Sequence, residues 1–336
     1  ILGNVSQFAV LLDLRRDELV LASLPFFHSF GCTVTLWFPV IEGVRIVTYP
    51  SPLEAAKNAG LIDRYGVTVM FATPTFLRAY LRKAEPHELR SLRITITGAE
   101  KLPNELASAF EARFSKQVYE GYGLTETSPV ISVNLPDPIP KVAGESVQPS
   151  SRLGSAGKMA PGIGAEIREP ETGAKISLHE TGMLWVRGPN IFDGYLNDPA
   201  RSAEVLEDGW FKTGDLGRFD ADGFLYIEGR LSRFSKIGGE MVPHEIIEQK
   251  IISALHLDGH SERAIAVMGV PDEVKGEALV LLSSVEIDAQ QLRVALRDAD
   301  VPNLWVPRTI CRVESIPVLA SGKLDLGRCK DLARAA

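Results

Sequence analysis

Short apolar runs alternate with amphipathic segments over the first 133 residues. The runs at 19–24, 44–48, 67–72, 92–97 and 117–119 consist mostly of apolar and β-branched residues, which is typical of buried strands. The segments 53–65, 74–83 and 103–115 have helical spacing, and the last two open with Pro at a first-turn position. Repeated strand–helix–strand order predicts a mostly parallel sheet covered on both faces, with ligands at the carboxyl ends of its strands.

The pattern changes twice further along the chain. Residues 134–152 are rich in Pro, Gly and Ser and indicate a linker or a long surface loop. From 153 to 228, short runs separated by turn signals predict a small antiparallel sheet or barrel. After Gly229, a helix near Pro243 and alternating apolar runs predict a compact α+β lobe.

We therefore expect three parts. An α/β subdomain that binds nucleotide and acyl group would span 1–150, a β-barrel-like subdomain 151–229 and an α+β C-terminal lobe 230–336. The helical spacing of Val5, Phe8 and Leu12 near a start without Met predicts a helix, and we expect a further segment before Ile1.

Composition excludes several classes of protein. Hydrophobic residues at 45% and charged residues at 24% are ordinary globular values. The net charge is −7 and no basic cluster occurs, which argues against nucleic acid as a partner. No apolar run approaches the roughly 18 to 20 residues of a membrane-spanning helix. Three cysteines without close pairing favour a reducing compartment, so we expect a cytoplasmic protein.

Residues 119–129 (YEGYGLTETSP) concentrate groups that suit a nucleotide. The ring of Tyr122 can cover a base, Thr125 can hydrogen-bond a phosphate, and Glu126 is a hard oxygen ligand for Mg²⁺. Gly121 and Gly123 permit close backbone approach. The alternative interpretation is a glycine turn with a buried tyrosine and a solvated glutamate.

Three further positions are candidates, each with a plainer alternative. Asp215, between Gly214 and Gly217, can accept two hydrogen bonds from a ribose diol, or it can lie on a solvated hairpin turn. Arg230 can donate to sugar or phosphate through its planar fork, or it can be a surface arginine. Lys323, in a Ser-Gly-Lys turn, can neutralise developing negative charge, or it can be an exposed lysine.

Histidine patterns argue against a zinc site. His28 follows the strand predicted at 19–24 and lies among aromatic residues, where a core histidine is commoner than a catalyst. The remaining histidines show no metal-ligand spacing with one another or with the cysteines. We assign His28 at most a gating or shaping role at the substrate site.

Five motifs in order resemble the adenylate-forming (AMP-binding) superfamily of acyl-CoA synthetases, adenylation domains and luciferases. They are 97–100, 119–129, 209–217, 229–248 and 321–323, and the resemblance covers nearly the whole chain. Within that superfamily, the motif at 229–248 looks most like the acyl-carrier-protein synthetase part of bifunctional 2-acylglycerophosphoethanolamine acyltransferases.

The resemblance implies a role for each matching residue. Adenine would be bordered by Gly98, Ala99 and Glu100, with Tyr122 stacked on it, and Gly123 would also belong to the nucleotide site. Thr125 would bind phosphate and Glu126 Mg²⁺, while Asp215 and Arg230 would take the ribose hydroxyls. Lys323 would bridge the substrate carboxylate and the α-phosphate of ATP, and His28 and Gly121 would face the acyl substrate. Ser232 would be the pivot of a mobile C-terminal lobe.

Two departures from the family pattern matter. The pivot is usually Asp or Lys followed by an acidic residue, whereas this chain has Ser232 and Arg233. The Ser/Thr/Gly-rich loop that holds the β- and γ-phosphates should precede the helix containing Asn4 and is absent from the chain. The resemblance also implies an acyltransferase part before Ile1, which would bring the full-length protein to the inner membrane.

The leading hypothesis is ATP-dependent activation of a fatty acid as acyl-adenylate, followed by transfer to the phosphopantetheine thiol of acyl-carrier protein or CoA. Two alternatives stay open. The chain could be a catalytically incompetent fragment that retains AMP or acyl-adenylate binding. It could also be a ligase for another carboxylic acid, such as an aryl or amino acid.

Overall fold

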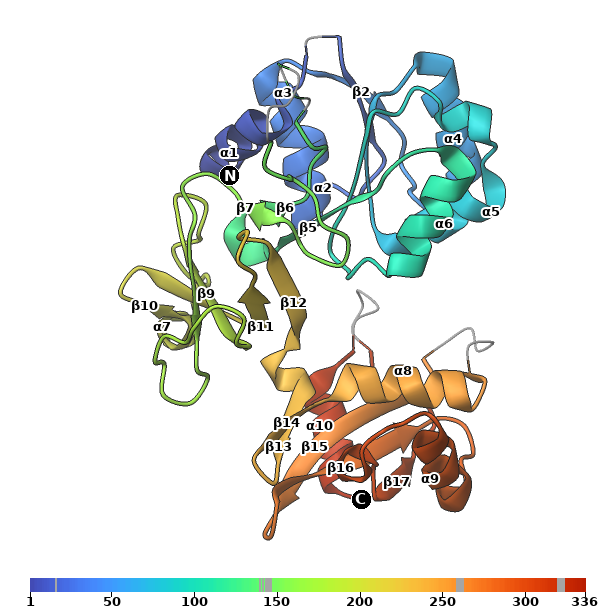
Figure 1. The fold of residues 1–336 in the computed structure, drawn as a ribbon, viewed down its shortest axis with the longest axis vertical. Helices are drawn as coiled ribbons and strands as arrows, with labels where there is room; N and C mark the ends of the chain where they lie inside the picture. Colours follow the sequence, from blue (N-terminus) through green and yellow to red (C-terminus); the bar gives the residue numbers. More distant parts are fainter. Residues whose placement is uncertain (16, 139, 141, 143–146, 258–262, 319–323) are drawn as a thin grey trace. The chain divides into compact units, whose positions relative to one another are not determined.

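The structure is a computed structural model that describes residues 1–336 apart from 16, 139, 141, 143–146, 258–262 and 319–323. Contacts divide the chain into two compact units, unit 1 (Ile1–Glu228) and unit 2 (Gly229–Ala336) (Figure 1).

Unit 1 is built on the predicted parallel sheet. Among the described residues this sheet has seven strands, in the order β2-β1-β3-β4-β5-β6-β7. The strands are β1 Leu19–Ala22, β2 Arg45–Thr48, β3 Val69–Ala72, β4 Ile94–Thr97, β5 Tyr119–Gly123, β6 Val130–Val133 and β7 Lys158–Met159. The strands β2, β1, β3, β4 and β5 pair in parallel with one another, whereas β6 pairs antiparallel with β5 and β7 antiparallel with β6.

Helices cover both faces of this sheet, as predicted (Figure 1). The helices α4 Ala55–Tyr65, α5 Pro74–Lys83 and α6 Asn104–Phe114 share one core with inward residues such as Leu21 and Met70. The helix α1 Leu2–Leu12 and the helical segment from α2 Ser29–Gly31 to α3 Phe38–Glu42 share the other core with Val20 and Phe71. Alternate residues of each strand point to opposite faces, so each strand contributes to both cores.

The helical segment after β1 differs from the expectation. The sequence predicts a strand at 19–24, but β1 ends at Ala22, and after the turn at 23–28 the chain is helical from Ser29 to Glu42. The middle part of this helical segment, Cys32–Trp37, is a π-helix. Phe38 is buried against Phe8 of α1, with ring centroids 5.2 Å apart. Tertiary packing on α1 therefore decides the secondary structure of residues 29–42, because their apolar residues have no clear period in the sequence.

A second, antiparallel sheet completes unit 1 and agrees with the prediction for 153–228. It comprises β8 Gly164–Arg168, β9 Gly182–Arg187, β10 Leu206–Glu207, β11 Trp210–Phe219 and β12 Leu225–Arg230, with the helix α7 Pro199–Val205 before β10. Ile131 of β6 is buried with Leu184 and Phe211 in one core. The two sheets of unit 1 therefore share apolar packing, which holds their adjoining edges together.

Unit 2 is an α+β unit, as predicted. Its sheet contains β13 Phe234–Ile237, β14 Glu240–Pro243, β15 Ile265–Asp272, β16 Gly276–Ser283 and β17 Thr309–Arg312, with α8 His244–Ala254, α9 Ala289–Asp298 and α10 Leu326–Arg334. Residues of α8 and α9 pack in one core, and those of α10 in another. Within the described parts of both units, helices fall short of the length and apolar character that crossing a membrane requires.

Candidate functional site

Residues 119–129 form a strand, a turn and the approach to a second strand. The expectation that the first strand ends at 119 is wrong, because β5 continues to Gly123 by pairing with β6. A Cβ added to Gly123 would lie 1.9 Å from the carbonyl oxygen of Pro129, so no larger residue fits there. The expected close backbone approach thus occurs between two strands of the sheet. It places the short helical turn Thr125–Thr127 at the end of β5.

Tyr122 and Asp215 are brought together from the two sheets of unit 1. The Tyr122 hydroxyl donates a hydrogen bond to a carboxylate oxygen of Asp215. Asp215 lies within β11, which corrects its interpretation as a residue of a solvated hairpin turn. The pairing of β11 with β9 shifts register between Lys212 and Leu216, and Gly214 has a φ of +72° there. Such a bulge re-aims a side chain, and here the side chain of Asp215 is buried.

Thr125 and Glu126 each have a partner that the sequence patterns did not indicate. The hydroxyls of Thr125 and Ser29 are 3.2 Å apart, and the Tyr195 hydroxyl donates to the Glu126 carboxylate at 2.8 Å. Burial, and then the bond to Glu126, raise the pKa of Tyr195, so its proton stays available for donation. Ser29 and Tyr195 are therefore additional candidate site residues.

In the sequence, only the glycine before Tyr195 could have marked it as a site residue. It follows Gly194, just as Tyr122 follows Gly121, and an aromatic residue after glycine is common wherever a chain turns. Ser29 carried no such signal, because a serine near a helix start is ordinarily a capping residue.

Residues 98–100 follow β4 and lie next to β5. The nearest neighbours of a Cβ added to Gly98 would be the Phe30 ring at 3.3 Å and the Gly121 carbonyl oxygen at 3.5 Å. Ala99 adopts a φ of +67°, a left-handed conformation that is uncommon for alanine. The Glu100 carboxylate accepts a hydrogen bond from the Thr75 hydroxyl at 2.8 Å. Gly98 and Gly121 are thus neighbours, as a shared ligand site requires.

His28 occupies an exposed position at the start of α2 rather than a place in a core. Its Nδ1 accepts a hydrogen bond from the Phe30 backbone N–H at 3.2 Å, which caps the helix. The aromatic residues around it are divided: Phe30 is 8% exposed, whereas Phe27 is 94% exposed. The nearby apolar surface therefore does not form one closed cluster.

Glu120 lines a cavity of about 200 Å³ between α6 and residues 151–155. Burial raises the pKa of the Glu120 carboxyl to about 7, while a hydrogen bond from the Leu102 backbone and the charge of Lys101 act in the opposite direction. Glu120 is thus a titratable group near Tyr122, and sequence patterns did not select it.

The remaining predicted positions belong to unit 2. Arg230 ends β12, and Ser232 is exposed in the short turn Leu231–Arg233. Arg233 is buried and donates to the Glu248 carboxylate at 2.6 Å and to the Val267 carbonyl at 3.0 Å. Lys323 lies outside the described residues.

The arrangement around Glu126 fits a metal held jointly by protein and phosphates. Within the described ranges, no group of three or more His, Cys, Asp and Glu side chains could hold a metal ion. Mg²⁺ commonly keeps water ligands and binds through one or two carboxylates together with substrate phosphates. A single partly exposed carboxylate next to Thr125 suits that mode.

Comparisons with known proteins point in one direction. The model of the family described as "AMP-binding enzyme" matches residues 1–196. A "Long-chain-fatty-acid--CoA ligase" of Bacillus subtilis (strain 168) is 31% identical over 334 residues, covering 96% of this chain and 56% of the relative. A "4-coumarate--CoA ligase 2" of Oryza sativa subsp. japonica is 30% identical over 321 residues, covering 93% and 54%. The chain thus spans about half the length of these relatives.

Solved structures have the same fold. The o-succinylbenzoate CoA synthetase of Bacillus subtilis in complex with its acyl-adenylate intermediate has a TM-score of 0.78 and 26% identity, over 98% of this chain and 64% of that one. The complex of the Bacillus subtilis synthetase with ATP and magnesium ion has a TM-score of 0.76 with 26% identity, over 98% of this chain and 64% of that one.

Proposed function

The chain belongs to the AMP-binding enzyme family, and we propose that it carries the nucleotide and acyl sites of an ATP-dependent acid–thiol ligase. The observation that carries the proposal is the contact between Tyr122 and Asp215. It joins an aromatic ring, which offers a face to adenine, to a carboxylate, which can accept hydrogen bonds from a ribose diol. Thr125 and Glu126 follow in the next turn, where the phosphates and Mg²⁺ would bind.

The proposed reaction has two steps. A carboxylate oxygen of the acid attacks the α-phosphorus of ATP, the bond to the bridging oxygen breaks, and pyrophosphate leaves. A thiolate then attacks the acyl carbon, and AMP leaves with the electron pair of the broken acyl–oxygen bond. A free carboxylate is a poor acyl donor, and the adenylate supplies a good leaving group.

The residues of this chain would position and stabilise rather than form a covalent intermediate. Thr125 would donate to a phosphate oxygen, and Lys323 would lie between the carboxylate and the α-phosphate, where negative charge develops. Asp215 and Arg230 would hold the ribose. Mg²⁺ held at Glu126 supplies positive charge against the phosphates.

For the substrate we propose a fatty acid, which agrees with the name of the Bacillus subtilis relative. The Phe30 ring, close to His28 in the chain and 8% exposed, supports an apolar acyl group. An aryl acid is the alternative, because the rice 4-coumarate–CoA ligase is almost equally similar. Both names favour CoA as the acceptor, whereas acyl-carrier protein is the finer proposal that rests on the motif at 229–248.

A second candidate function is binding without turnover. The chain covers 56% of the Bacillus subtilis ligase, so groups that make adenylate in that protein need not all be present here. In that case the chain would bind AMP or acyl-adenylate without releasing pyrophosphate. An acyltransferase part and association with the inner membrane stay predictions for the full reading frame, as does the cytoplasmic location.

The test measures AMP affinity by calorimetry and pyrophosphate release with ATP, Mg²⁺ and either palmitate or 4-coumarate. Asp215→Ala should weaken AMP binding at least tenfold, whereas Glu111→Gln, an exposed carboxylate on α6, should not. Binding with turnover supports the ligase, and binding alone supports the second candidate. Absence of AMP binding would refute both. Supplying CoA or phosphopantetheinylated carrier protein then identifies the acceptor.

A further inference from the structure

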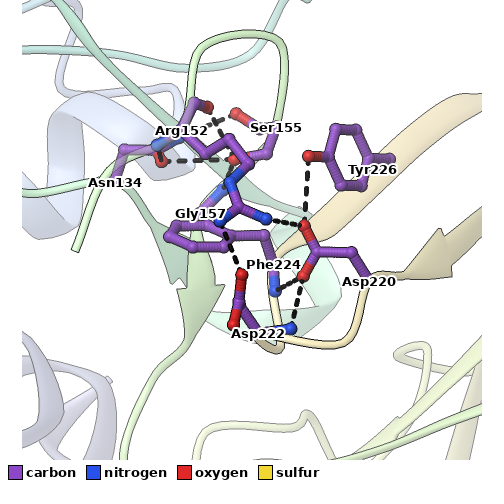
Figure 2. A network of polar contacts seen from close by, with 8 residues as sticks. All are labelled: Asn134, Arg152, Ser155, Gly157, Asp220, Asp222, Phe224 and Tyr226. Atoms are coloured by element: carbon purple, nitrogen blue, oxygen red, sulfur yellow. Dashed lines mark hydrogen bonds and ion pairs between the residues drawn. The ribbon is translucent and has the colours of Figure 1, made fainter. Parts of the chain in front are cut away.

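Arg152 links the segment between β6 and β7 to the turn between β11 and β12 (Figure 2). Its guanidinium pairs with the Asp220 carboxylate and, at 2.6 Å, with that of Asp222. The guanidinium carbon lies 4.5 Å from the centroid of the Phe224 ring. Tyr226 donates its hydroxyl hydrogen to Asp220 at 3.2 Å. A planar guanidinium that spans two carboxylates restrains both, which a single lysine ammonium could not do in the same geometry.

The backbone of Arg152 is tied to the parallel sheet through Asn134. The Arg152 N–H donates to the Asn134 side-chain oxygen at 2.8 Å, and Ser155 donates to the same oxygen at 3.2 Å. The Asn134 amide nitrogen in turn donates to the Glu120 carbonyl at 3.1 Å. Asn134 is 4% exposed, so these bonds are shielded from water.

Together with the Tyr122–Asp215 bond, these contacts form a closed loop that joins β5 to β11. Glu120 and Tyr122 are two residues apart on β5, and Asp215 and Asp220 are joined by the end of β11. The Tyr122–Asp215 bond connects the two strands at one point, and the chain Glu120–Asn134–Arg152–Asp220 connects them at another. Two links leave less freedom for one strand to slide past the other than a single link would.

We infer that Arg152 is a positioning residue for nucleotide binding, which acts by fixing Asp215 of β11 relative to Tyr122 of β5. This inference rests on the proposed function, because it assigns the base and the ribose to those two side chains. Arg152 itself would not touch the nucleotide. Its loss loosens β11, so AMP must then order the site as it binds, and affinity falls.

The experiment is a double-mutant cycle on AMP affinity. Arg152→Ala should weaken AMP binding 5- to 10-fold on its own and less than 2-fold in an Asp215→Ala background, because the residue through which it acts is then gone. Arg218→Ala is the matched control. Arg218 lies on β11, but its ion pair, at 3.1 Å, is with Glu228 of β12 rather than with Arg152's partners Asp220 and Asp222. The control should change affinity less than 2-fold.

Hydrogen exchange without nucleotide gives a second, independent readout. Arg152→Ala should speed exchange of the β11 amides, and Arg218→Ala should not. Equal weakening of AMP binding in both backgrounds, or no change in either affinity or exchange, would overturn the inference. If Arg152→Ala fails to fold, Asp222→Asn, at an exposed carboxylate, removes one of the two ion pairs and should weaken AMP binding 2- to 3-fold; unchanged binding in that variant would likewise overturn the inference.

Failure of the proposed function would look different. The unsubstituted chain would then not bind AMP at all, and the exchange rates of β11 would still decide whether Arg152 restrains that strand.

Discussion

Replacement of Glu120 by Gln should remove a pH dependence of folding. The folded-state pKa of Glu120 is raised to about 7 from an ordinary value of 4.5, with burial as the largest cause. Between these values the folded chain keeps a proton that the unfolded chain has released, so the free energy of unfolding falls as the pH rises. The loss begins near pH 4.5 and is complete above pH 7. Glutamine stays neutral and has nearly the same shape as glutamic acid. The free energy of unfolding of Glu120→Gln should therefore lack this decrease between pH 4.5 and 7.

The size of the effect follows from the two pKa values. A difference of about 2.5 units corresponds to about 3.4 kcal/mol when fully expressed. The side chain of Glu120 is only partly buried. Its contact with water reduces the expected change in the free energy of unfolding to about 1.5 kcal/mol. At pH 5 the two proteins should be nearly equal in stability, and at pH 8 the Gln variant should be more stable by about that amount.

Urea unfolding at pH 5, 6, 7 and 8, followed by tryptophan fluorescence, measures this difference. The measurements are made in a Trp305→Phe background, because Trp305 belongs to unit 2 and the other three tryptophans belong to unit 1. Glu111→Gln is the control, since Glu111 borders the same cavity but is exposed. A stability difference between the Glu120 variant and its parent that is the same at pH 5 and pH 8 would refute the reasoning.

Three other substitutions test the site and the lobe. Tyr195→Phe removes the donor to Glu126 at a cost of about 1.5 kcal/mol, so the Mg²⁺ concentration for half-maximal pyrophosphate release should rise about tenfold; an unchanged Mg²⁺ dependence contradicts the assignment. Gly123→Ala places a Cβ 1.9 Å from a backbone oxygen and should lower the melting temperature of unit 1 by several degrees, as a thermal scan will show. Arg233→Met removes the buried ion-pair partner of the Glu248 carboxylate, which keeps the Val267 N–H at 2.7 Å and the Arg263 guanidinium at 3.4 Å. The variant should destabilise unit 2 by about 2 kcal/mol, seen as faster hydrogen exchange in α8 and β15, whereas equal exchange would refute the assignment.

Much of the architecture could be predicted from local pattern. The apolar runs that became β1 to β4 and the helices α4, α5 and α6 lie close to their predicted positions, because a strand buried on both faces and a helix buried on one impose distinct periods on the chain. The same reasoning made no prediction for residues 29–42. There the apolar residues face α1 and the sheet together, and a π-helix distorts the expected spacing.

The candidate site divides in the same way. Tyr122, Thr125, Glu126 and Asp215 could be selected from the sequence, because aromatic, hydroxyl and carboxylate groups between glycines are unusual in a plain turn. Their roles stay predictions. Arg233 was visible only as a departure from a family pattern, and its burial against Glu248 needed the structure.

The sequence by itself determined most of the segments that form strands and helices and selected the candidate site residues, because burial and backbone geometry act over a few neighbouring positions. Only the tertiary structure decided the partners. Tyr122 meets Asp215 across 93 positions, Glu126 meets Tyr195 across 69, and Arg152 meets Asp220 across 68. Such pairs depend on how two sheets pack and on a register shift within β11, and these properties arise from the chain as a whole.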